Sequence, residues 1–104
     1  QAFVLDKPMR VHVVCLGEGV GSDMADYGWI ENAADDEIVW EMTYRRSKWA
    51  GGADKNRFVD TYVMLDAGKY RAHFVSDDSH SFGNWNSGPP NTPQRWGITI
   101  TKGE

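Results

Sequence analysis

The chain alternates between apolar and polar residues over several short stretches, and this alternation predicts β-strands. It is clearest between Glu37 and Tyr44, where Ile38, Trp40, Met42 and Tyr44 fall on one face. Successive side chains of a strand point to opposite faces, so this stretch predicts a strand with one buried face. Alternation, short apolar runs and β-forming residues predict six further strands, at residues 2–5, 9–16, 27–30, 57–65, 70–76 and 97–101.

Glycines and polar residues separate these stretches and predict the connections between them. Three glycines lie within residues 17–21, and residues 22–26 continue as a polar loop. Residues 45–56 combine Ala-Gly-Gly-Ala with five charged residues, which predicts a second long loop. Residues 57–65 also fit a helical period, but their valines, threonine and tyrosine favour a strand and no strong helix cap precedes them.

About seven strands, with no helix and no internal repeat, predict an all-β domain. The sequence Leu-Asp-Ala-Gly-Lys-Tyr, which ends at Tyr70, resembles the tyrosine corner of Greek-key sandwiches, where the phenol hydroxyl bonds to the backbone a few residues upstream. We therefore expect residues 1–104 to form a single antiparallel two-sheet sandwich, Greek-key or jelly-roll-like, with one long ordered loop. The predicted core consists of Val13, Trp29, Ile38, Trp40, Phe58, Tyr62, Phe74 and Ile98.

Composition and charge exclude several classes of function. With 40% hydrophobic and 25% charged residues among 104, the chain has the composition of one globular domain. Its net charge of -4, with acids and bases interspersed, offers no basic surface to a phosphate backbone, so we expect no nucleic-acid binding. We also expect no membrane insertion, because no apolar run approaches the ~20 residues of a spanning helix. Cys15 is the single cysteine and lies in an apolar run, which predicts a buried thiol.

The predicted long loop, residues 77–95, is the most informative part of the chain. It is rich in Pro, Gly, Asn and Ser, yet it also contains large aromatic residues, which disordered segments usually lack. Rigid aromatic rings beside polar side chains are the usual anchors of sugar-stacking and protein-binding surfaces. The alternative is that these rings pack the loop onto the domain as a small core of its own. The predicted ligand-binding residues are Trp49, His80, Asn84, Trp85, Asn86, Arg95 and Trp96.

The same loop carries closely spaced Asp and Asn residues that suit a hard cation. Calcium prefers six to eight oxygen ligands, and Asp77, Asp78 and Asn84 are the predicted metal ligands. Their spacing does not match an EF-hand, and the alternative is that these side chains form turns that hold the loop's own backbone.

Catalysis is not expected from the motifs of this chain. Ser79 and His80 are neighbours on an extended loop, where adjacent side chains point in different directions and cannot converge as a triad. The chain contains neither the G-x-S-x-G elbow of hydrolases nor the H-E-x-x-H spacing of zinc proteases. A zinc site would require His12 and His73 to meet His80, and nothing in the spacing supports this.

Two stretches resemble a known family. Phe-Val-Leu-Asp-Lys-Pro-Met-Arg-Val-His-Val-Val at residues 3–14 and Leu-Asp-Ala-Gly-Lys-Tyr-Arg-Ala-His-Phe-Val at residues 65–75 resemble bacterial pre-peptidase C-terminal accessory domains. The resemblance implies a non-catalytic β-sandwich, extracellular or periplasmic, that assists a larger protein through surface or substrate binding, sometimes with calcium. This chain departs from the family by inserting residues 77–95 before its final strand.

These observations together predict a non-catalytic accessory module of a larger, secreted bacterial protein. Because the chain begins at Gln1 without a methionine, we expect a domain excised from, or appended to, that protein. The first hypothesis is binding of a carbohydrate or similar polar ligand through the aromatic-rich loop. The alternative is a structural or docking domain, with calcium as a candidate stabilising ion, that packs on a neighbouring domain or partner protein. The two hypotheses differ in whether Trp85 is exposed in the isolated domain.

Overall fold

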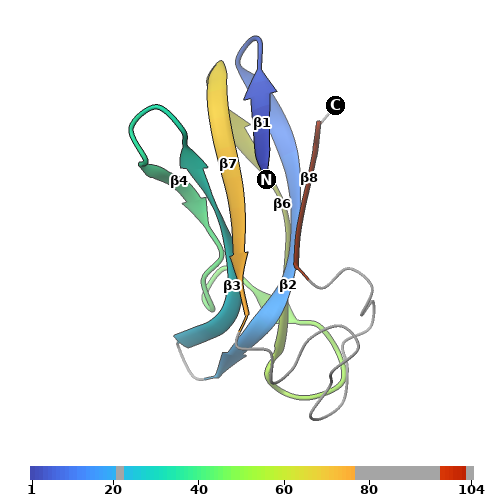
Figure 1. Ribbon diagram of the computed structural model, residues 1–104. Coiled ribbons are helices and arrows are strands. Elements are labelled where there is room, and N and C mark those ends of the chain that lie inside the picture. The colour runs from blue at the N-terminus through green and yellow to red at the C-terminus, as the bar shows by residue number, and fades with distance from the viewer. Residues whose placement is uncertain (21–22, 77–96, 103–104) are drawn as a thin grey trace.

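The computed structural model describes residues 1–20, 23–76 and 97–102, and these residues form an all-β fold without a helix (Figure 1). The all-β prediction is therefore confirmed for this part of the chain. Its strands are β1 (Ala2–Leu5), β2 (Met9–Val20), β3 (Asp23–Asn32), β4 (Ile38–Glu41), β5 (Lys48–Trp49), β6 (Asn56–Leu65), β7 (Gly68–Val75) and β8 (Gly97–Lys102).

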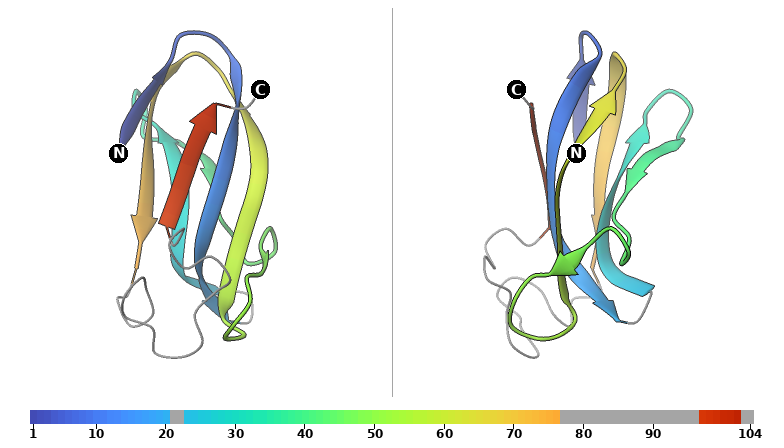
Figure 2. Two further views of the ribbon diagram at one scale, coloured as in Figure 1. Left: turned by 90° about the vertical axis from the view of Figure 1, so that its right-hand side faces the viewer. Right: turned by 180° about the vertical axis from the view of Figure 1, so that it is seen from behind.

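The strands form one curled antiparallel sheet in the order β1-β7-β3-β2-β6-β5, with β4 beside β3 and β8 beside β2. Strand β2 connects the two halves of the curl. It pairs with β6 along residues 9–18, with β8 along residues 11–15, and with β3 only at residues 18–20. The curl brings β2 and β6 opposite β3 and β7, so the inner faces of both pairs enclose the core (Figure 2).

Strand β2 continues through Gly17, where the sequence predicted a break. An added Cβ at Gly17 would lie 2.0 Å from the carbonyl oxygen of Asp26, so the backbone of β3 passes directly over this residue. Glycine is needed here for the close approach of two strands and not for a turn. A register shift between Glu18 and Gly19 marks a bulge at the same crossing. The predicted loop over residues 22–26 is also wrong from Asp23 onwards, because β3 begins there.

The other predicted strands are present, β1 with the predicted ends and the rest with shifted ends. Residues 57–65 form most of β6, so the strand prediction is correct. The helical spacing of apolar residues in this stretch does not correspond to a helix. The alternating stretch at 37–44 gives the shorter β4, which ends at Glu41. The predicted loop at 45–56 contains the two-residue strand β5, which pairs with the start of β6.

The core lies inside the curl and draws buried residues from both of its halves. Val13 and Trp40 are buried as predicted, while Phe74 and Ile98 are partly buried against the core cluster. The core cluster consists of Leu5, Val11, Val13, Cys15, Ile30, Trp40, Met42, Val59, Leu65 and Tyr70.

Two predicted core residues are wrong, because Ile38 is 51% exposed and Tyr62 is 53% exposed. Along β6 the alternation places Tyr62 on the outer face, together with the exposed Met64. Ile38 is the first residue of β4 and pairs with Glu31 of β3. A register shift in β3 lies between Ile30 and Glu31, directly beside this pair. Trp29 and Phe58 are partly buried and lie outside the core cluster.

The hydrogen bond expected at the tyrosine corner is present. The Tyr70 hydroxyl donates to the carbonyl oxygen of Asp66 at 2.7 Å, and the side chain is almost completely buried. Burial, and next the nearby charge of Asp66, raise the pKa of Tyr70, so the phenol remains a donor. This bond fixes the connection from β6 to β7 and thereby the register of β7 against β3.

Candidate functional site

Only one predicted ligand-binding residue, Trp49, lies in the part of the chain that the structure describes. It belongs to β5 and is 57% exposed, which suits a ligand contact. The predictions for the long loop stay predictions, because its residues lie outside the described ranges. These are the ligand-binding residues His80, Asn84, Trp85, Asn86, Arg95 and Trp96 and the metal ligands Asp77, Asp78 and Asn84.

Hydrogen bonds fix the position of Trp49 and of the connection that follows it. Its indole Nε1 donates to the carbonyl oxygen of Ala53 at 3.2 Å, which ties the ring to its own loop. The fully buried Asn56 donates from Nδ2 to the carbonyl oxygen of Gly51 at 2.8 Å. Gly51 has a φ of 90°, a conformation that glycine adopts without steric cost. The ring is therefore an exposed aromatic surface with a fixed position.

A second group of aromatic and charged side chains lies on the outer face of β3 and β7, which we call the β3–β7 face. The register pairs Trp29 with His73 and Glu31 with Arg71. Because the intervening Ile30 is buried in the core, these alternate residues share the outer side of the sheet. The rings of Trp29 and His73 stack with their centroids 5.0 Å apart and an interplanar angle of 21°. The Tyr27 ring lies 5.6 Å from that of Trp29.

Glu31 is the centre of this face. Its Oε1 accepts one hydrogen bond from Arg71 Nε at 2.8 Å and another from His73 Nε2 at 2.7 Å. A carboxylate oxygen only accepts, so Nε2 of His73 carries the proton. Arg71 also donates from its Nη2 to Asp36. Neither Oε2 of Glu31 nor Nη1 of Arg71 takes part in these bonds.

Glu31 is held in its ionised form. The hydrogen bond from Arg71, and next that from His73, lower the pKa of Glu31 below its ordinary value of 4.5. The carboxylate therefore stays charged through neutral and mildly acidic pH. The Arg71 guanidinium is correspondingly stabilised, since the bond to Glu31 raises its pKa.

The lowered pKa predicts how the stability of the domain depends on pH. A carboxyl group whose pKa is lower in the folded state than in the unfolded state stabilises the fold at any pH above its pKa in the unfolded state. This contribution is lost as the pH falls through its pKa in the folded state. We expect Glu31→Gln to lower the midpoint of thermal unfolding at pH 7, and the difference from wild type to narrow as the pH falls below 4.5. Thermal scans across pH test this, with the exposed Glu37→Gln as the control. A difference that stays constant with pH would contradict the prediction.

A comparable pair lies on the outer face of β2 and β6, which we call the β2–β6 face. His12 Nε2 donates to Asp60 Oδ1 at 2.6 Å, and the His12 ring stacks on Tyr62 with centroids 4.7 Å apart. The Arg10 guanidinium lies 4.6 Å from the centre of the Tyr62 ring. The Asp60 side chain is 55% exposed, compared with 18% for Glu31, so this carboxylate is less firmly enclosed.

The two histidines in the described residues thus bind separate carboxylates, His12 on β2 and His73 on β7. The structure therefore does not bring His12 and His73 together. Across residues 1–20, 23–76 and 97–102, no group of three or more His, Cys, Asp or Glu side chains could hold a metal ion.

Cys15 is the buried thiol that the sequence predicted. It is inaccessible to solvent, and burial raises its pKa to about 12. The thiolate is the reactive form of cysteine, so this side chain cannot act as a nucleophile in the folded protein. We expect a thiol reagent such as DTNB to leave Cys15 unmodified at pH 8 and to titrate it fully in denaturant. Rapid labelling of the folded domain would show that β2 opens locally.

Sequence reasoning missed Glu31 and Arg71, which pair across 40 residues of chain. A partial signal is visible, because Tyr27, Trp29 and Glu31 alternate along one strand and Arg71 and His73 along another. The register that brings the two strands together depends on tertiary structure and is not encoded in either stretch alone.

No family model, curated protein or solved structure matches this chain. In the described ranges, no helix is long and apolar enough to span a membrane.

Proposed function

We propose that this chain is a non-catalytic binding module of a larger, secreted bacterial protein, and that it binds a carbohydrate or similar polar ligand on the β3–β7 face. One observation carries the proposal: the Glu31 carboxylate is fixed by Arg71 and His73 beside the Trp29 ring. In its finer architecture we propose a Greek-key sandwich, which the corner bond of Tyr70 supports.

The arrangement suits a ligand that carries hydroxyl groups. A sugar hydroxyl both donates and accepts, so it needs an acceptor and a donor placed side by side. Oε2 of Glu31 is such an acceptor and Nη1 of Arg71 such a donor, while Trp29 and Tyr27 supply the neighbouring apolar surface. The existing ion pair holds both polar groups before a ligand arrives, which reduces the entropy lost on binding.

The aromatic-rich loop, residues 77–95, comes shortly after the end of β7 in the sequence. Val75 pairs with Tyr27 at the last position of β7, and Ser76 Oγ then donates to Asp26 Oδ2 at 3.2 Å. Residues 77–95 begin at the next position of the chain. We propose that Trp85 of this loop and Trp96, the residue after it, also take part in ligand binding.

Isothermal titration calorimetry with a panel of neutral and acidic oligosaccharides tests the proposal. Glu31→Gln replaces the charged acceptor and is expected to weaken binding by roughly tenfold to a hundredfold, since hydrogen bonds to charged groups contribute about 1.5–3 kcal/mol. The matched control is Asp60→Asn, which breaks the other carboxylate–histidine pair on the β2–β6 face. We expect this control to bind within about twofold of wild type, a range set by screened surface charges. The proposal fails if no oligosaccharide binds or if both variants bind equally well.

A further inference from the structure

Two strand edges lie open on one side of the curl. Strand β1 pairs with β7 on one edge, and strand β8 pairs with β2 on one edge. No other strand in the described ranges pairs with either of them. Figure 2 (left) shows β8 beside β2, with β1 on the other side of a gap.

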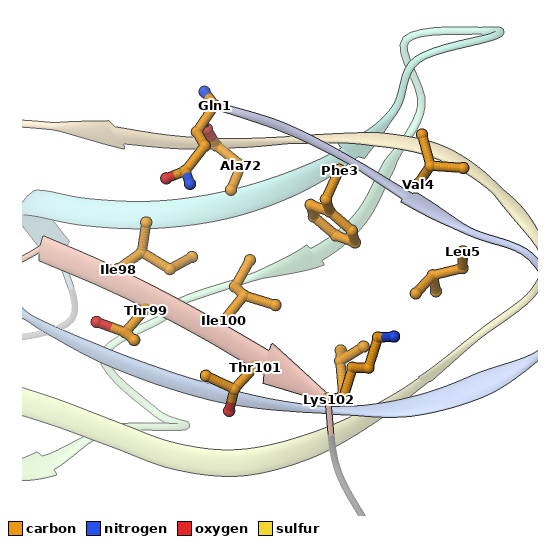
Figure 3. A pocket seen from close by; sticks show the side chains of 11 residues that line it. Gln1, Phe3, Val4, Leu5, Ala72, Ile98, Thr99, Ile100, Thr101 and Lys102 are labelled. Atoms are coloured by element: carbon orange, nitrogen blue, oxygen red, sulfur yellow. Dashed lines mark hydrogen bonds between the residues drawn. The ribbon is translucent and has the colours of Figure 1, made fainter.

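The space between these two edges is an apolar cavity of about 370 Å³. Figure 3 shows Phe3 and Leu5 of β1 pointing towards Ile98 and Ile100 of β8, whereas Val4 points away. Val11 and Ala72 also line the cavity. Apolar side chains of both β1 and β8 therefore line the cavity, next to the unpaired backbone N–H and C=O groups of the two strand edges.

Among the described residues, neither β1 nor β8 carries the features that usually protect an open strand edge. Proteins block such edges with proline, with charged side chains or with a covering segment, because unpaired N–H and C=O groups recruit other strands. Ala-Phe-Val-Leu of β1 contains neither proline nor charge, and Gly-Ile-Thr-Ile-Thr-Lys of β8 has its only charge at Lys102. An apolar cavity between two unprotected strand edges is therefore a surface on which another strand can pair.

We propose that this cleft binds an extended peptide segment of a partner protein, which adds a strand to the sheet between β1 and β8. Strand addition draws its affinity from main-chain hydrogen bonds and its specificity from alternate side chains. The occupant is therefore a segment with aliphatic residues at every second position, which enter the cavity over Phe3 and Ile100. This site is separate from the β3–β7 face and does not depend on the function proposed for that face.

The proposed strand runs antiparallel to both edges, which is the commoner kind of pairing. β8 is antiparallel to β2, β2 to β3, β3 to β7 and β7 to β1, so β1 and β8 run in the same direction. A single strand can therefore be antiparallel to both, which places its N-terminal end beside Lys102. Because Lys102 is the charged side chain that lines the cavity, the partner segment carries a carboxylate near its N-terminal end.

Two labelled peptides test the site and its polarity by fluorescence anisotropy. The first is Glu-Thr-Val-Thr-Val-Thr-Val-Thr, capped at both ends, and the second carries the glutamate at the C-terminal end instead. We expect the first to bind up to about fivefold more tightly, which is the range of an exposed ion pair. Lys102→Glu is expected to reverse this preference, because the two carboxylates repel each other. Exchanging the glutamate of the first peptide for lysine is expected to restore its tighter binding to this variant.

Two further arms separate strand addition from other occupants. N-methylation of alternate amides along the peptide removes its edge donors and is expected to abolish binding. Phe3→Ser is expected to weaken binding, whereas Val39→Ser, at an exposed position of β4 outside the cavity lining, is not. Thermal scans of each variant show which are folded, and Lys102→Glu remains a test if Phe3→Ser unfolds.

The proposal is overturned by any of three results. One is that neither peptide binds, and another is that the N-methylated peptide binds as well as the parent peptide. The third is that the cleft takes a different occupant. This occupant is either a fatty acid, shown by decanoate displacing the peptide, or a second copy of the domain, shown by sedimentation in the absence of peptide.

Discussion

Replacing Gly17 by alanine is expected to destabilise the domain by at least about 3 kcal/mol, at the upper end of overpacking effects. The new methyl group would lie 2.0 Å from the carbonyl oxygen of Asp26 and 2.9 Å from the carbonyl carbon. Both atoms belong to the backbone of β3, so no side-chain rotation can relieve the contact. β2 and β3 must separate at the crossing that joins the two halves of the curl. Urea unfolding followed by tryptophan fluorescence measures the loss.

Gly28→Ala is the matched control for this prediction. Its added Cβ would meet side-chain atoms, with Cys15 Sγ at 2.9 Å and Ile98 Cδ1 at 3.0 Å. Side chains can shift by a few tenths of an ångström, so we expect a smaller loss, within about 1–3 kcal/mol. If Gly17→Ala proved as stable as wild type, β3 could not cross β2 as closely as the structure shows.

Ile30→Ala is expected to cost about 2–5 kcal/mol, the range for removing a large aliphatic side chain from a packed core. Ile30 is fully buried and belongs to the core cluster inside the curl. In a domain of this size, the loss corresponds to a fall of roughly ten degrees or more in the midpoint of thermal unfolding. Thermal and urea unfolding of the variant both measure the effect.

Ile38→Ala provides the control with the same chemical change. Ile38 is 51% exposed at the start of β4, so the loss of its methyl groups leaves no enclosed cavity. We expect a cost below about 1 kcal/mol, in keeping with surface substitutions. Equal costs at the two positions would place Ile38 in the core, as its alternation pattern alone predicted.

The strands could be predicted because their signal is local. A short apolar run identified β1 with correct ends, and β-forming residues identified β6 as a strand. The spacing of Gly68 and Tyr70 correctly predicted the corner bond. Gly17 was misread because glycine serves both turns and close strand crossings, and only the position of Asp26 distinguishes the two. Tyr62 was misread because alternation shows that two faces differ but does not show which face is covered.

The candidate site was less predictable, because it depends on pairing between distant strands. Trp29 was predicted as a core residue, yet the register places it beside His73 on the outer face. The group around Glu31 arises only when β3 and β7 align, and the register is set in part by the Tyr70 corner. The prediction of an exposed ring at Trp49 could be made locally, since a loop of glycines and charges flanks it.

An NMR titration tests the proposed ligand-binding face most directly. The five tryptophans each give an indole N–H signal in the ¹⁵N-labelled domain, and Trp→Phe variants assign them. With an oligosaccharide that binds in calorimetry, we predict the strongest shift at Trp29 and none at the buried Trp40. Additional shifts at Trp85 and Trp96 would show that these two residues also take part in ligand binding. Shifts confined to Trp49, Trp85 or Trp96, with Trp29 unchanged, would contradict the assignment of the β3–β7 face.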